Sequence, residues 1–81
     1  MQRDFNYLYL DLRYKYDGFW THSGVTTLAN GDVPGLPNER AALATEMAYY
    51  YLSYYGSKCT EVIVRLFHSD KDAYTQVHVT R

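Results

Sequence analysis

The feature that most constrains the fold is one helical stretch, residues 38–56 (NERAALATEMAYYYLSYYG), with strand-like sequence on both sides. Asn38 is a good helix N-cap, and Glu39 suits the first turn, where a negative charge meets the positive end of the helix dipole. Gly56 is placed to follow the last helical residue. The stretch therefore predicts one helix over residues 38–55, and the remaining segments must form strands and loops around it.

The predicted helix has a broad apolar arc, because its apolar residues recur every three or four positions. The arc predicts that Tyr50, Tyr51, Tyr54 and Tyr55 pack mainly against a sheet. The opposite side, toward water, carries Glu46, Tyr49 and Ser53. The full arc comprises Leu43, Ala44, Met47, Ala48, Tyr50, Tyr51, Tyr54 and Tyr55.

Residues 5–28 predict a β-hairpin, since apolar residues alternate over 5–16 and the Asp17-Gly18 dipeptide favours a tight two-residue turn. Leu8, Leu10 and Leu12 would face the core, and the second strand would return over 19–28 with a bulge or bend at Ser23-Gly24. Counting back from the turn predicts these pairs: Tyr16 with Phe19, Lys15 with Trp20, Tyr14 with Thr21, Arg13 with His22, Leu12 with Ser23, Leu10 with Val25 and Tyr9 with Thr26.

Residues 60–80 predict a second hairpin with a polar turn at 69–72. The register that places all the valines on one face pairs Val62 with Val79 and Val64 with Val77. The same register pairs Leu66 with Thr75, Phe67 with Tyr74, Arg65 with Gln76 and Ile63 with His78. The expected fold is therefore α+β: a ββαββ single domain over residues 1–81, with a loop at 29–37 and one helix on one face of a four-stranded, mainly antiparallel sheet.

One helix leaves the other sheet face uncovered, and the sequence places aromatic and charged residues there. A solvated face is normally rich in Thr, Lys, Glu and Ser, whereas aromatic and Arg residues are typical of interface centres. Two explanations are a partner-binding face and a homodimer face; a third is that the predicted register is wrong, or that the helix and the 29–37 loop cover more than this plan assumes. The candidate binding residues are Tyr7, Tyr9, Arg13, Trp20, His22, Arg65, Phe67, Tyr74 and His78 on the sheet, with Tyr49 on the helix.

Catalytic and cofactor motifs are not recognisable in the sequence. His22 and His78 lie on different hairpins without the close ligand spacing of a zinc site. Cys59 has Lys58 beside it but no histidine that the pattern can place near it, and His22 and Ser23 point to opposite faces of a strand. We expect a non-enzymatic protein without metal or cofactor.

Composition narrows the class of partner. Eight basic against nine acidic residues give a formal net charge of −1, which disfavours a non-specific nucleic-acid binder. A single-stranded nucleic-acid platform remains the alternative, because bases stack on aromatic sheet faces. One cysteine and the lack of an apolar leader or span predict a cytoplasmic protein without membrane contact.

In its size, its one helix on a sheet and its lack of a catalytic motif, the chain resembles the small inhibitors encoded by phages and mobile elements, anti-CRISPR proteins among them. The resemblance implies a protein that blocks a host defence or nucleoprotein complex by occupying one of its surfaces. It carries over no functional residue. The expected function is thus that of a protein-binding module.

Overall fold

The computed structural model of the chain describes residues 8–28, 37–68 and 74–81, and only the backbone of residues 37 and 38. The expected strand start at Phe5, the candidate residue Tyr7, most of the 29–37 loop and the 69–72 turn lie outside this description. The elements in chain order are β1 (Leu8–Tyr16), β2 (Phe19–Leu28), α1 (Pro37–Tyr55), β3 (Cys59–Phe67) and β4 (Thr75–Thr80).

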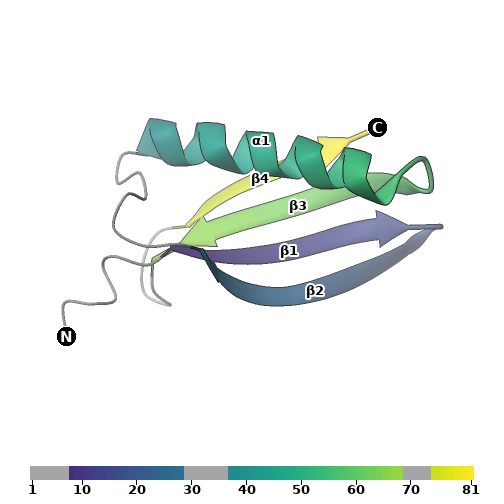
Figure 1. Cartoon of the computed structure of the whole chain (residues 1–81), viewed down its shortest axis with the longest axis horizontal. Helices are drawn as coiled ribbons and strands as arrows, with labels where there is room; N and C mark the ends of the chain where they lie inside the picture. The colour runs from purple at the N-terminus through teal and green to yellow at the C-terminus, as the bar shows by residue number, and fades with distance from the viewer. Residues whose placement is uncertain (1–7, 29–36, 69–73) are drawn as a thin grey trace.

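The four strands form one antiparallel sheet in the order β2-β1-β3-β4, and α1 packs against one of its faces (Figure 1). The predicted ββαββ fold is confirmed. The sequence left the strand order open; the structure places β1 and β3 in the centre and β2 and β4 at the edges. Because β2 and β3 both run antiparallel to β1, they run parallel to each other on either side of it.

The first hairpin forms as predicted near its turn and departs from the prediction beyond it. Asp17 and Gly18 both have positive φ, 53° and 88°, as the predicted tight turn requires. The pairs from Tyr16 with Phe19 back to Arg13 with His22 match the predicted register.

A bulge then shifts the register of β2 by one residue, as the Ser23-Gly24 dipeptide suggested. Leu12 pairs with Gly24 rather than Ser23, Leu10 with Thr26 rather than Val25, and Tyr9 with Thr27 rather than Thr26. The three predicted pairs beyond the bulge were wrong because the extra residue was not counted into the register. Each later side chain of β2 therefore changes face, since neighbouring residues of a strand point to opposite sides.

The second hairpin has the predicted register, from Val62 with Val79 to Leu66 with Thr75. The ladder ends at this last pair, so the predicted pair of Phe67 with Tyr74 does not form. Phe67 instead pairs with Tyr9 of β1, and β1 and β3 run together along nearly their whole length. The two hairpins are thereby joined through their inner strands.

The helix begins at Pro37, one residue before the predicted start, where the missing N–H of proline costs no hydrogen bond. It ends at Tyr55, and Gly56 follows with φ of 88° and donates its N–H to the Ser53 carbonyl at 3.2 Å. This is the predicted glycine stop. The described part of the chain contains no helix with the length and apolarity of a membrane span.

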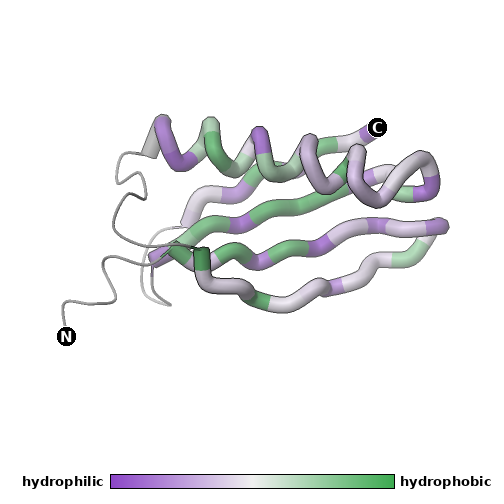
Figure 2. Tube along the Cα trace, viewed as in Figure 1, coloured by the Kyte–Doolittle hydropathy of each residue, from purple (hydrophilic) through white to green (hydrophobic). Residues whose placement is uncertain are grey.

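The core lies between α1 and the two central strands. Apolar residues concentrate in β1 and β3, while the later part of the helix is pale on the hydropathy scale because it is rich in tyrosine (Figure 2). The buried apolar residues are Leu8, Leu10, Leu12, Ala44, Ala48, Leu52, Cys59, Val62, Val64, Leu66 and Val79.

The helix is offset from the middle of the sheet, because it packs over β3 and β4. Because of this offset, the predicted apolar arc was wrong at two positions, Tyr50 and Tyr54, which are 60% and 67% exposed. Leu52, which the predicted arc did not include, is buried. Tyr51 and Tyr55 do pack against the core, as predicted. β2 consequently has no helix above it and is exposed along most of its length.

Candidate functional site on the uncovered sheet face

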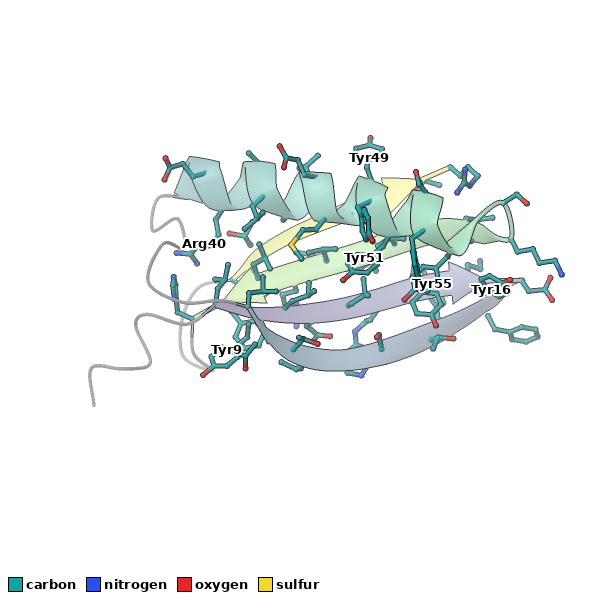
Figure 3. All side chains as sticks on the ribbon, viewed as in Figure 1. Tyr9, Tyr16, Arg40, Tyr49, Tyr51 and Tyr55 are labelled. Carbon is teal, nitrogen blue, oxygen red and sulfur yellow. The ribbon has the colours of Figure 1, made fainter. Side chains whose placement is uncertain are left out.

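The sheet face turned away from α1 is the candidate site, and we call it the open face. It is formed by alternate residues of all four strands, which the register brings into rows across the sheet. Figure 3 shows Tyr9 on the side of the sheet away from the helix, whereas Tyr49 points from the outer side of α1. The described residues of the open face are Tyr9, Asp11, Arg13, Lys15, Trp20, His22, Val25, Thr27, Glu61, Ile63, Arg65, Phe67, Tyr74, Gln76, His78 and Thr80.

One charged cluster on the open face centres on Asp11 of β1. His22 Nε2 lies 2.6 Å from Asp11 Oδ1, and Arg13 Nη2 lies 3.8 Å from Oδ2. The register of the hairpin next to its turn sets up the first contact, because His22 of β2 lies beside Arg13 and diagonal to Asp11 on the same face. The carboxylate is well covered, with its side chain 12% exposed, whereas the Arg13 and His22 side chains are 47% and 43% exposed.

A second cluster centres on Glu61 of β3 and repeats this arrangement. His78 Nε2 lies 2.8 Å from Glu61 Oε1, and Lys15 Nζ lies 3.7 Å from Oε2. Each carboxylate thus has one imidazole and one basic side chain as partners. Among the described residues of the open face, both acidic groups have basic partners within the face, and the histidine and basic side chains remain partly exposed.

Aromatic rings frame the two clusters. Trp20 reaches from edge strand β2 over the central strands, and its ring centroid lies 6.1 Å from that of His78 on β4. Tyr9 and Phe67 meet on the central strands at 5.6 Å. These contacts join residues from all four strands into one surface.

At the β3–β4 side of the open face, one arginine links the polar and aromatic parts. The Arg65 guanidinium lies 4.4 Å from the centroid of the Tyr74 ring and donates two hydrogen bonds to Gln76 Oε1, at 3.0 and 3.2 Å. A guanidinium over a ring face is attracted by the ring quadrupole. The side chains that would meet a partner are therefore held in place before it arrives.

The single cysteine, Cys59, belongs to the buried core and not to the open face. Cys59 is buried, and burial raises the pKa of its thiol, which keeps it in the unreactive protonated form. Within residues 8–28, 37–68 and 74–81, no three His, Cys, Asp or Glu side chains are placed to hold a metal ion. What the open face offers is recognition: rings for stacking, and basic and imidazole groups for hydrogen bonds to an anionic or polar partner.

Most of the predicted binding residues lie together on the open face: Tyr9, Arg13, Trp20, His22, Arg65, Phe67, Tyr74 and His78. Tyr49 is exposed but belongs to the outer surface of α1 and is not part of this face. Sequence reasoning missed Val25, which the bulge moves onto the open face and which is 56% exposed. Gly24 was the available signal, because a glycine inside a strand commonly marks a bulge.

Comparison of the chain with family models, with curated proteins and with solved structures found no match.

Proposed function

We propose that the chain is a non-enzymatic binding module that captures another protein through the open face. The observation that supports this proposal is the combination of aromatic rings and internally paired charges on a sheet face that α1 leaves uncovered. Aromatic and Arg side chains dominate the binding energy of protein interfaces. Fixing them before binding reduces the entropy that association costs.

The charges of the open face favour a partner with an acidic surface. Three basic side chains, Arg13, Lys15 and Arg65, stand against two acidic ones, Asp11 and Glu61, although the whole chain has a formal net charge of −1. Charge complementarity of this kind increases association rates and rejects like-charged surfaces. A module of this type would act by occupying a partner surface, and we propose this occlusion, rather than catalysis, as its mode of action toward a host defence or nucleoprotein complex.

The proposal is tested by affinity capture from a lysate of the host, with variants that distinguish the faces. Replacing Trp20 and Tyr74 by alanine removes two exposed rings from the open face, and replacing Tyr49 and Tyr50 removes two exposed rings from the helix. We expect the first pair of changes to abolish capture of the partner and the second pair to leave it intact. Undiminished capture of the partner by the Trp20→Ala/Tyr74→Ala variant would assign the binding to another surface.

A further variant, Tyr9→Ala/Phe67→Ala, tests the centre of the face. These rings are partly covered, so its folding must be verified by circular dichroism and thermal unfolding before the capture result is used. A folded variant that has lost the partner supports the central rings as the anchor.

Single-stranded nucleic acid is the second candidate partner, and one observation favours it. Tyr9 and Phe67 lie side by side on the two central strands of a four-stranded sheet, with Arg13 and Arg65 on the same face. Aromatic side chains placed on a sheet in this way stack on unpaired bases. A mobility shift with single-stranded oligonucleotides at low salt, weakening as salt rises, would support this alternative; no shift at low salt would remove it.

A further inference from the structure

A second surface lies on the helix side of the sheet, where α1 ends above the tip of the first hairpin. The offset of α1 toward β3 and β4 leaves a shallow hollow of about 580 Å³ at this point. Tyr51 and Tyr55 point from the helix toward the strands, and Tyr16 marks the hairpin end (Figure 3). The residues that line the hollow are Tyr14, Tyr16, Thr21, Tyr54 and Tyr55.

The floor of the hollow is a fixed pair of stacked rings. The centroids of Tyr14 and Tyr55 lie 4.1 Å apart with an angle of 16° between the ring planes, and a hydrogen bond joins their side chains. Tyr54 packs edge-on against Tyr55 at 5.2 Å and stacks with Tyr50 at 6.0 Å. Because each ring is held by the next, little side-chain freedom is lost when a ligand arrives.

The chemistry of this lining excludes several ligand classes. It contains no charged residue, so it offers no ion pair to a phosphate, a carboxylate or an ammonium group. A quaternary ammonium ligand prefers a cage of open ring faces, and the stacking of Tyr14 on Tyr55 takes one face of each of these rings out of such a cage. What remains is a neutral surface of aromatic rings and hydroxyl groups, which can pack against apolar rings and donate hydrogen bonds to carbonyl oxygens.

A proline-rich segment in the polyproline II conformation has the complementary properties. Its backbone has no internal hydrogen bonds, so its carbonyl oxygens are available to hydroxyl donors, and its rings suit an aromatic surface. Grooves lined by aromatic residues are the known receptors of such segments, and their ligands lose little entropy because they are already extended. We propose that the tyrosine hollow at the end of α1 binds a proline-rich peptide segment of a partner protein.

The test is titration of the purified chain with a synthetic oligoproline, followed by two-dimensional NMR of the tyrosine rings. We expect saturable shifts of the rings that line the hollow and no such shifts with a Gly/Ser-rich peptide of equal length, which is flexible and lacks rings. Choline and a cello-oligosaccharide serve as competing ligand classes. Saturable binding of either one at the hollow, without oligoproline binding, would overturn the proposal.

Matched variants locate the site. Tyr54→Ala and Tyr49→Ala each remove one exposed tyrosine from the same helix, but only Tyr54 lines the hollow. We expect Tyr54→Ala to weaken oligoproline binding by at least about tenfold, as for an interface anchor, and Tyr49→Ala to leave it unchanged. An absence of saturable shifts, or equal affinity in the two variants, would overturn the proposal.

This site is on the opposite side of the sheet from the open face, so either proposal can be refuted without refuting the other. The Trp20→Ala/Tyr74→Ala variant should bind oligoproline with unchanged affinity even where it loses its protein partner. Tyr54→Phe gives a finer test: it keeps the ring and removes the hydroxyl, and a weaker affinity would identify the hydroxyl as a hydrogen-bond donor to the peptide.

Discussion

Arg81 holds the end of the helix to the sheet, and replacing it by alanine should destabilise the fold. Its Nη2 donates hydrogen bonds to the carbonyls of Leu52 and Gly56, at 2.6 and 3.1 Å, and its Nε donates one to the carbonyl of Cys59 at 2.9 Å. The first two carbonyls lie at the C-terminal end of α1, where a positive charge is also favoured by the helix dipole. One side chain at the end of the chain thus joins α1, the following turn and β3.

The expected cost can be derived from these contacts. A hydrogen bond to a charged group contributes about 1.5–3 kcal/mol in net terms when it is shielded from water. Arg81 is exposed, so solvent screening reduces the sum of its three bonds, and we expect a loss of about 2 kcal/mol in the free energy of unfolding. For a domain of this length that loss corresponds to a fall in Tm of about 8–16 °C.

The assay is urea unfolding followed by circular dichroism, with Lys58→Ala as the control. Lys58 is exposed and lies in the turn between α1 and β3, close to the carbonyls that Arg81 binds. Its replacement therefore removes an equal charge without removing the three hydrogen bonds of Arg81. We expect the control to change stability by less than about 0.5 kcal/mol. Arg81→Lys should be intermediate, since an ammonium group lacks the planar fork that reaches several carbonyls together. An Arg81→Ala variant as stable as the control would refute the proposed role of this residue.

Three further predictions concern single residues. Burial, the neighbouring Tyr14 charge and a hydrogen bond that the neutral Tyr55 hydroxyl donates to Tyr14 raise the pKa of Tyr55 to about 12. The stability supplied by this neutral phenol is therefore present below about pH 10 and lost between about pH 10 and 12; a tyrosinate absorbance titration should show a phenol that ionises late, and the absence of a late phase would contradict this. Gly24→Ala should destabilise the fold by about 1–3 kcal/mol, because φ of 109° strains a residue with a Cβ even though that Cβ would meet open space; thermal unfolding measures the change, and an unaltered Tm would contradict it. The Cys59 thiol, buried and with a raised pKa, should react with a thiol reagent only after denaturation, and rapid reaction of the native protein would show that the site opens.

The sequence predicted the fold well where local chemistry determines it. The Asp17-Gly18 turn set the register of the first hairpin as far as Arg13, and the valine pattern set that of the second. The first register rests on the geometry of a tight turn, and the second on the alternation of side chains along two strands. The strand order could not be predicted in this way, because it depends on which strands of the two hairpins meet.

The errors in the predicted helix arc have their cause in the offset of α1. Helical periodicity identifies an apolar arc but not the part of the arc that the sheet covers. Tyr50 and Tyr54 were predicted to pack against the sheet and are exposed, while Leu52, outside the predicted arc, is buried. Which residues of the arc are buried depends on where the helix lies on the sheet, and the local sequence does not determine that position.

The candidate site shows the same limit. Strand alternation placed Trp20, His22 and His78 on one face, and the structure brings them there. The contact between Trp20 and His78 spans two intervening strands, so it follows only from the strand order and the curvature of the sheet. The hollow lined by Tyr54 was not predicted, because it exists only where the end of the helix meets the tip of the first hairpin.

The most direct test of the central proposal is quantitative affinity capture with the two matched variants, Trp20→Ala/Tyr74→Ala and Tyr49→Ala/Tyr50→Ala, after both have been shown to unfold at the temperature of the unaltered protein. Each variant loses two exposed aromatic rings, one from the open face and the other from the helix. The proposal predicts that the partner is lost with the open-face variant and retained with the helix variant. A partner retained by the open-face variant would contradict it.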